Sequence, residues 1–290
     1  MSWRSVVISS RCKLDYSMNY MVVRGEETRR VLLDEIAMLI IENNAVSLTC
    51  CLLSALVEKK IKVVFCDGKH SPQSELVPYY GAHNCSLKIR QQMDWDPVTK
   101  REVWTSIVSE KIRNQSVLLQ RIGKDTESEM LDGYLAELEP GDITNREGHA
   151  AKVYFNAIFG MDFTRNDEEN PVNVALNYGY AILLSTFNRE VVANGYLTQL
   201  GIAHENQFNY FNLSCDLMEP FRVVVDERVV PFVGTEFDKD AKHELIALLN
   251  KKYIIGDREQ TLLNAIKIYT KSVLDALNER NPLMIKNIVI

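Results

Sequence analysis

Several features of secreted, membrane and zinc-binding proteins are missing from this 290-residue sequence. No run approaches the 18 or so consecutive apolar residues that a membrane-spanning helix needs. The first residues contain neither an apolar core nor a small-residue cleavage site, so no secretory signal is visible and we expect a cytoplasmic protein without membrane contact. The six cysteines include no CxxC pair, which excludes the usual zinc spacing and a disulfide framework.

Positive charge is also scarce. The chain has 33 Lys and Arg against 39 Asp and Glu, which gives a net charge of −6. Proteins that simply bind nucleic acid are usually basic as a whole, so this balance speaks against that class. It still allows local basic patches, and an acidic metal site would add negative charge of its own.

The first 80 residues have the short apolar runs of strands, with two short helices among them. We predict strands over residues 5–10, 14–15, 20–24, 46–48 and 62–66. Apolar residues at 32, 33, 36, 39 and 40 have helical spacing and predict a helix over 31–42. Thr49 is expected to cap a second helix that runs to Lys59. Residues 70–83, with two prolines and a glycine, predict a loop or linker.

Beyond residue 80 the periodicity becomes that of long helices. We predict helices over 97–122, where Asp96-Pro97 is a typical start, and over 146–159, 174–194, 239–253 and 258–278. At this length one large or two moderate domains are expected. The patterns therefore predict an α+β protein, with a β-rich N-terminal domain (1–80) and a larger helical domain (81–290).

Three segments of the helical half concentrate polar residues. The first carries Glu147 on a helix with small neighbours, and the second presents His204 after a glycine. The third holds Asp216 and Glu219, which point the same way if the segment is helical. Taken singly, each has an ordinary interpretation: Glu147 as a solvated residue, His204 as a structural histidine, and Asp216 with Glu219 as a helix cap.

Taken together, these residues suit a divalent metal. Carboxylates favour hard cations such as Mg²⁺ and Mn²⁺, and one imidazole shifts the preference toward Mn²⁺. Such a set leaves positions for water and a phosphate oxygen. No glycine-rich phosphate loop, GxSxG motif or Cys/His nucleophile pair offers a competing chemistry.

The order and spacing of these segments resemble the CRISPR adaptation integrase family. The most recognisable match is 216–222 with Asp226, joined by Asn173 and the Asn-Tyr-Gly-Tyr stretch at 177–180. Further resemblance covers 36–43, taken as a helix, 63–67 and 78–95, so it spans essentially the whole chain. The compact length and residues 91–95 are most similar to members from type II systems.

The resemblance implies that Glu147, His204 and Glu219 are the catalytic metal ligands, with Mg²⁺ or Mn²⁺ as cofactor. It implies a β-sandwich-like N-terminal domain that forms a homodimer, and a helical catalytic domain. It also implies a heterohexamer with a small ferredoxin-like adaptation partner, contacts with other type II adaptation and effector proteins, and binding of double-stranded DNA. The activity implied is metal-dependent endonuclease and strand transfer, which joins the 3′-hydroxyl of a short fragment to CRISPR repeat boundaries.

Other residues have open roles in the sequence. Asp216 could be a ligand, a partner of a ligand or a cap. Arg222 and Asn145 could orient phosphate, Arg146 could pair with an acid, and Tyr154 could contact a strand end or pack in a helix face. Candidates for phosphate contact are Lys88, Arg90, Lys152, Arg165 and Arg189. Two other functions fit the same residues: a nuclease that hydrolyses branched or single-stranded DNA, and an architectural DNA-binding subunit.

Overall fold

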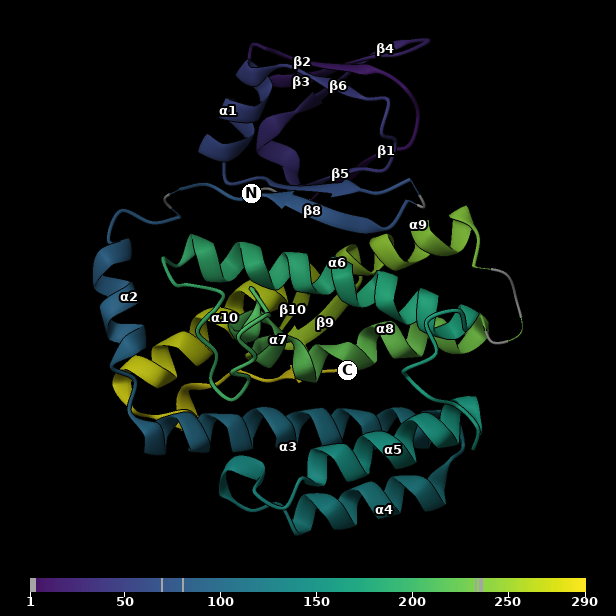
Figure 1. Cartoon of the computed structure of the whole chain (residues 1–290), viewed down its shortest axis with the longest axis vertical. Helices are drawn as coiled ribbons and strands as arrows, with labels where there is room; N and C mark the ends of the chain where they lie inside the picture. The colour runs from purple at the N-terminus through teal and green to yellow at the C-terminus, as the bar shows by residue number, and fades with distance from the viewer. Residues whose placement is uncertain (1–3, 69, 80, 233, 235–236) are drawn as a thin grey trace. The chain divides into compact units, whose positions relative to one another are not determined.

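The computed structural model describes residues 4–68, 70–79, 81–232, 234 and 237–290. The chain divides into two units, residues 1–83 and 84–290, whose elements are labelled in Figure 1. Residues 1–3, which bear on the expected absence of a secretory signal, and Tyr80, within the expected loop, lie outside the described residues. The α+β class predicted from the sequence is confirmed, with strands concentrated in the first unit and helices in the second.

In its described residues, the first unit contains two four-stranded sheets and one α-helix. One sheet has the order β1-β5-β7-β8 and the other β4-β3-β2-β6. Strands β1, β5 and β7 run parallel, and β8 is antiparallel to β7. The elements are β1 (Arg4–Ile8), β2 (Lys13–Ser17), β3 (Tyr20–Arg24), β4 (Thr28–Leu32), β5 (Ile36–Ile41), β6 (Ser47–Leu48), α1 (Cys50–Glu58), β7 (Lys62–Cys66) and β8 (Pro72–Leu76).

The predicted helix over 31–42 is wrong. The segment forms the end of β4, a short 3-10 turn (Leu33–Glu35) and β5, whose six residues are all buried. A strand covered on both faces reads as a continuous apolar run, and over so short a stretch this pattern also satisfies helical spacing. The expected loop over 70–83 is partly wrong as well, because it contains β8. The cap at Thr49 is confirmed: its side chain accepts a hydrogen bond from Leu52 N.

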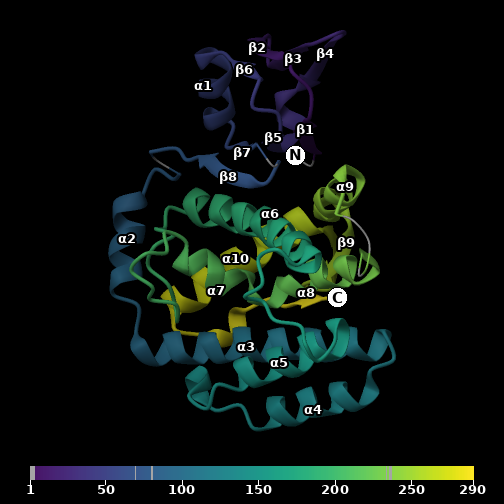
Figure 2. The same ribbon diagram turned by 45° about the vertical axis from the view of Figure 1, so that its right-hand side comes forward.

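The second unit is mainly helical. Its helices are α2 (Cys85–Met93), α3 (Pro97–Arg121), α4 (Asp125–Ala136), α5 (Arg146–Phe159), α6 (Pro171–Ala193), α7 (Asn212–Met218), α8 (Arg222–Val229), α9 (Lys239–Ala247) and α10 (Leu262–Glu279). The longest, α3, starts as predicted: Asp96 accepts a hydrogen bond from Thr99 N at 2.8 Å, and Pro97 follows. In Figures 1 and 2, α4 and α5 lie beside α3, which also contacts α8.

This unit also carries a small sheet, so it is not wholly helical. The strands are β9 (Lys252–Ile255), β10 (Arg258–Thr261) and β11 (Ile288–Val289), in the order β10-β9-β11. The helices expected over 239–253 and 258–278 are therefore shorter than predicted. Strand β9 takes the place of the end of the first predicted helix, and β10 takes the place of the start of the second. Thr261 caps α10, because its side chain accepts a hydrogen bond from Asn264 N. In the described part of the chain, no helix is long and apolar enough to cross a membrane.

Candidate metal centre

Glu147 is positioned by the first turn of α5. Asp142, just before the helix, accepts hydrogen bonds from Arg146 N at 2.7 Å and from Glu147 N at 3.1 Å. These bonds satisfy amides that the first turn of a helix leaves without partners. Asn145 adopts φ 53° between them, a left-handed conformation that asparagine tolerates. The backbone that carries the Glu147 side chain is therefore fixed, and the side chain itself is 22% exposed.

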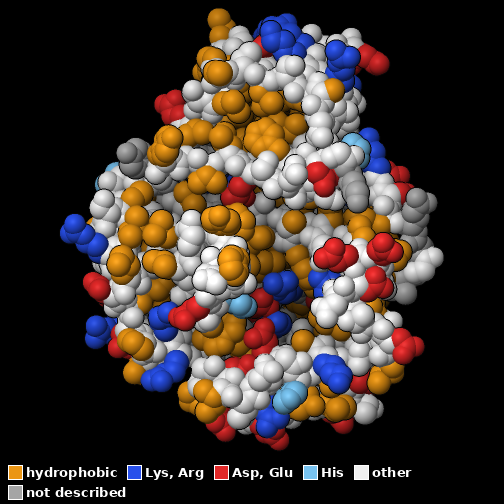
Figure 3. Space-filling model, in the orientation of Figure 1, with side chains coloured by type: hydrophobic (Ala, Val, Ile, Leu, Met, Phe, Trp, Pro, Cys, Tyr) orange, Lys and Arg blue, Asp and Glu red, His pale blue; other side chains and the backbone are white. Residues whose placement is uncertain are grey.

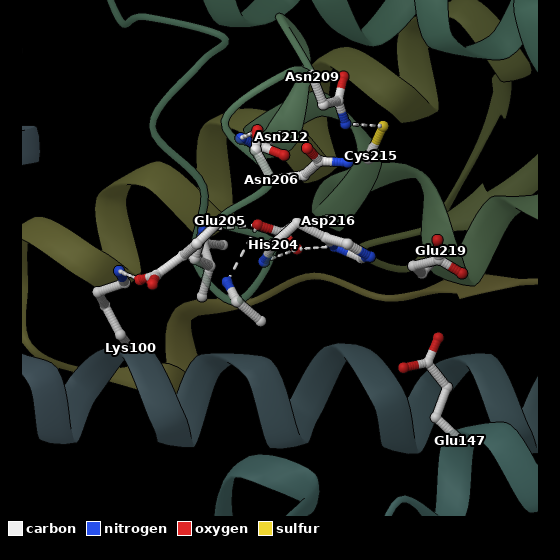
Figure 4. Close-up of polar contacts among 12 residues, drawn as sticks. Lys100, Glu147, His204, Glu205, Asn206, Asn209, Asn212, Cys215, Asp216 and Glu219 are labelled. Atoms are coloured by element: carbon white, nitrogen blue, oxygen red, sulfur yellow. Dashed lines mark hydrogen bonds and ion pairs between the residues drawn. The ribbon is translucent and has the colours of Figure 1, made fainter.

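Glu219 comes from a kink between two helices. Helix α7 ends at Met218, residues Glu219–Phe221 form a 3-10 turn with Pro220 inside, and α8 begins at Arg222. Asn114 on α3 donates a hydrogen bond to Pro220 O at 2.9 Å, which fixes this turn to the longest helix. The Glu219 side chain is only 4% exposed. Figure 4 shows the carboxylates of Glu147 and Glu219 facing each other across one space.

A lysine from α3 lies between these two carboxylates. Lys111 Nζ is 2.5 Å from Glu147 Oε1 and 2.5 Å from Glu219 Oε2, and its side chain is largely buried. The second Glu219 oxygen accepts a hydrogen bond from Arg222 Nε at 2.9 Å. Figure 3 shows acidic and basic side chains next to one another in a hollow of the second unit, beside a histidine.

These contacts fix the charges in the cluster. Burial by itself would raise the pKa of Glu219, but the charges of Arg222 and Lys111 outweigh it and lower that pKa to about 2. Burial likewise opposes the charged form of Lys111, yet the carboxylates of Glu219 and Glu147 raise its pKa. The pKa of Arg222 is also raised, since the charge of Glu219 outweighs its burial. Glu219 therefore stays anionic throughout the physiological range.

His204 stands on a turn that Asp216 holds in place. The buried Asp216 carboxylate accepts backbone hydrogen bonds from Ile202, Ala203 and His204. Asp216 Oδ1 also lies 2.5 Å from His204 Nδ1, and this hydrogen bond is the main cause of a raised His204 pKa. A side chain at Gly201 would meet His204 O and the Asp216 carboxylate, so only glycine fits this turn. Figure 4 shows the Asp216–His204 contact next to Glu219.

Asp216 is therefore not the helix cap that was one interpretation of the sequence. It lies in α7, whose N-cap position is Phe211, and its carboxylate points to the 201–204 turn while Glu219 points to Lys111 and Arg222. No capping box forms, because the two side chains bind different segments. Asp216 is the partner of a candidate ligand, and its hydrogen bond to Nδ1 leaves Nε2 as the ring nitrogen for a metal.

The donor set fits a divalent metal in its chemistry. Two carboxylates and an imidazole with a carboxylate behind it are typical of such centres. A cation, the Lys111 ammonium, already bridges the two glutamates. Among the described residues no group of three or more His, Cys, Asp or Glu is placed to hold a metal ion. The carboxylates close on Lys111, so a metal needs this ammonium to move aside.

The other predicted site residues lie at different distances from the cluster. Arg222 is part of it. Arg146 Nη2 lies 2.9 Å from Glu137 Oε2, and this ion pair agrees with the expectation that Arg146 could pair with an acid. Tyr154 is fully buried and donates to Asp226 Oδ2 at 2.9 Å, so it belongs to a packed helix face. Asn145 is exposed, and its side chain lies against Gly148, close to the helix start.

The candidate phosphate contacts also differ in exposure. Arg90 and Lys152 are exposed, and Lys88 lies over the Tyr196 ring. Arg165 donates to the side-chain oxygens of Asn173 and Asn177 and is half-buried. Arg189 pairs with Glu190 at 3.2 Å.

Sequence reasoning missed Lys111. A signal for it exists, since Lys111 continues the apolar stripe of α3 formed by Trp104, Ile107 and Val108 and is itself buried. A lysine in such a stripe needs a buried anion, because an unpaired ammonium is costly away from water. Trp104 from the same stripe also meets the His204 ring edge-on, with centroids 5.8 Å apart.

Comparison with known proteins places this chain in one family. The family model described as CRISPR associated protein Cas1 matches residues 6–245. A CRISPR-associated endonuclease Cas1 from Neisseria meningitidis serogroup C (strain 8013) is 33% identical over 99% of this chain and 96% of its own. A casposase bound to integration product aligns with a TM-score of 0.76 and 18% identity, over 97% of this chain and 92% of that one.

A further solved structure is a Cas6-RT-Cas1–Cas2 complex. It aligns with a TM-score of 0.74 and 17% identity and covers 97% of this chain. The chain spans only 36% of that longer protein. The family model and the full-length relative are the decisive matches, and on them this chain belongs to the CRISPR-associated Cas1 family.

Proposed function

We propose that this chain is the divalent-metal-dependent integrase of CRISPR spacer acquisition. It joins the 3′-hydroxyl of a short DNA fragment to a phosphodiester at a repeat boundary. The observation that carries the proposal is the pair of glutamates, Glu147 and Glu219, that converge from α5 and the α7–α8 kink on one cation. Beside them stands His204, held by Asp216.

Each residue of the cluster has a defined part in this reaction. Glu147, Glu219 and His204 would hold Mg²⁺ or Mn²⁺, which when bound would polarise the scissile phosphate and would favour loss of the proton from the attacking hydroxyl. Asp216 fixes the His204 ring and the 201–204 turn. Arg222 keeps the buried Glu219 anionic. The DNA end supplies the nucleophile, so no covalent protein intermediate is needed.

We infer the substrates and partners of this chain from what the names of similar structures state. The casposase structure is bound to an integration product, and the Cas6-RT-Cas1–Cas2 structure is a complex with Cas2. For this chain we propose double-stranded DNA as substrate, the small adaptation protein as partner and a homodimer formed through the β-rich unit. Arg90 and Lys152, both exposed, are the simplest candidates for phosphate contact.

A strand-transfer assay tests this function. Labelled 3′-hydroxyl fragments, a repeat-containing plasmid and the small adaptation partner are incubated with the protein and with Mg²⁺, Mn²⁺ or chelator. Joined product should require metal and should disappear in Glu147→Ala, His204→Ala and Glu219→Ala. The exposed Glu168→Ala serves as a matched control and should join DNA like wild type.

The alternatives give other products. Cleavage without joining under all conditions indicates a hydrolytic nuclease. Full joining by a destabilised Glu147→Ala protein indicates an architectural subunit whose acidic cluster supports folding.

A further inference from the structure

Lys111 occupies the point where the two glutamates of the candidate metal centre meet. Its ammonium lies 2.5 Å from an oxygen of each carboxylate. A metal bound by both glutamates would take this same position, since carboxylate oxygens lie at about 2.0–2.1 Å from Mg²⁺. Two cations cannot occupy one point, so metal binding must displace the ammonium from at least one glutamate.

A cavity next to the ammonium offers it another position. The cavity has a volume of about 150 Å³. It is lined by Lys111, Gln115, Phe155, Arg165, Tyr180, Glu219, Arg222 and Asp226. Three of these side chains are cationic, and Gln115 is 3% exposed with an Oε1 atom that has no hydrogen-bond partner. Gln115 Oε1 is a hydrogen-bond acceptor, so it can receive the displaced Lys111 ammonium but does not bind an anion. The three cations outnumber the two carboxylates of the lining, Glu219 and Asp226, so this wall suits a small anionic group.

The cations of this cavity differ in how firmly they are held. Arg222 is bound to Glu219 and lies over the Tyr180 ring at 4.7 Å. Arg165 is fixed by two asparagine oxygens. Lys111 alone of the three reaches the point between both glutamates, on a flexible four-carbon stem with three rotatable donors. It is therefore the cation that can change partners at the smallest structural cost.

We propose that Lys111 is an internal cation that competes with the metal for Glu147 and Glu219, and that a DNA phosphate entering the adjoining cavity draws it away. This inference rests on the metal site of the proposed function. Without DNA, the ammonium neutralises the facing carboxylates and weakens metal binding. With DNA, the phosphate gives the ammonium a new partner and frees both carboxylates. DNA and metal binding then favour each other, and the coupling is reciprocal.

Mn²⁺ titration of the full-length protein tests this competition. Binding is followed by calorimetry and by the Mn²⁺ EPR signal, with and without a short duplex whose 3′ ends lack the hydroxyl so that no joining occurs. Without DNA, Lys111→Met and Lys111→Gln should bind Mn²⁺ at least about tenfold more tightly than wild type, because the competing charge is gone. Lys271→Met, which removes an exposed lysine paired with Asp275 on α10, should leave Mn²⁺ affinity unchanged.

The DNA arm tests the change of partner. The duplex should tighten Mn²⁺ binding to wild type about tenfold and to the Lys111 variants by less than about twofold. Lys111 variants with wild-type or weaker Mn²⁺ affinity would overturn the competition. Variants that bind tightly but still gain as much from DNA as wild type would overturn the transfer to phosphate.

Two further measurements keep folding and site assignment separate from the proposal. Lys111→Gln retains a hydrogen-bond donor, so it remains interpretable if Lys111→Met unfolds. In metal-free buffer both variants should melt below wild type, and Mn²⁺ should raise their melting temperatures more than it raises that of wild type. Glu147→Gln should lose Mn²⁺ binding. If wild type and the Lys111 variants bind no Mn²⁺, the proposed metal site fails and the competition fails with it.

Discussion

Glu219 and Asp226 are two buried carboxylates seven residues apart, and their pKa values are shifted in opposite directions. Glu219 makes direct contacts with two cations, Lys111 and Arg222, which lower its pKa to about 2. Asp226 accepts hydrogen bonds only from the hydroxyls of Tyr154 and Tyr180 among the contacts described, and burial raises its pKa to about 6.

Arg222 lies between the two acids in the sequence but makes a direct hydrogen bond only to Glu219 among the contacts described. Its Nε donates to Glu219, while its guanidinium lies over the ring of Tyr180. The charges of Arg222 and Arg165 lower the pKa of Asp226 less than its burial raises it. Direct contact with a cation thus lowers the pKa of a buried carboxylate more than hydroxyl donors and more distant cations do.

Removal of the Glu219 charge should have the largest effect. Glu219→Gln should reduce strand transfer by roughly a thousandfold, since metal ligation is worth several kcal/mol in the transition state. Because it leaves Arg222 and Lys111 with one anion fewer, it should also lower the free energy of unfolding by about 3–5 kcal/mol. Strand-transfer rates and urea unfolding measure the two effects. Wild-type joining rates in Glu219→Gln would remove Glu219 from the centre.

Asp226→Asn should change the pH dependence of stability. The folded pKa of about 6 lies above the ordinary value of 3.8 for an aspartate, so the folded protein binds the proton more tightly. Wild type should therefore lose about 2 kcal/mol of stability relative to Asp226→Asn as the pH rises from about 4 to 6. Urea unfolding of both proteins at pH 4, 5, 6 and 7 measures the difference. Asp275→Asn, which removes one partner of an exposed ion pair, is the control. If the difference in unfolding free energy between wild type and Asp226→Asn did not change with pH, the raised pKa would be contradicted.

Asp216 is a third buried carboxylate, held by backbone amides and an imidazole. Asp216→Asn should lower metal affinity by about 10–100-fold through the loss of His204 orientation, while Glu147 and Glu219 remain in place. Mn²⁺ titration measures this loss, and Asp132→Asn, whose carboxylate binds Ser116 on α3, is a control away from the cluster. Unchanged Mn²⁺ affinity would show that the turn positions His204 without Asp216.

Loss of one hydroxyl donor should have the smallest effect. Tyr180→Phe removes a hydrogen bond to Asp226 and should cost about 1–2 kcal/mol of unfolding free energy at pH 7. Tyr269→Phe is the matched control, because the buried Tyr269 hydroxyl has no hydrogen-bond partner and its removal should be nearly neutral. Equal losses in the two variants would show that the Asp226 contact adds no stability.

Much of the fold could be predicted where local chemistry decides it. Asp96-Pro97 starts α3, Thr49 caps α1, and β7 and α5 have the bounds that their patterns predict. Prediction failed for β5, because all six of its residues are buried and the alternation of a half-exposed strand is missing. It also failed after residue 247, where β9 takes up residues that continue a helical pattern.

The sequence by itself determined the family, the three polar segments and the residue types able to hold a metal. The tertiary structure decided what each residue contacts. Lys111 reaches Glu147 and Glu219 across 36 and 108 positions of the chain, and Asp216 reaches the His204 turn across 12. The pKa shifts followed from these contacts: Glu219 and Asp226 are both buried acids, and only the folded chain puts two cations on one and two hydroxyls on the other. The physical reason is that a pKa depends on burial and on neighbours a few ångströms away, and folding brings those neighbours from distant parts of the sequence.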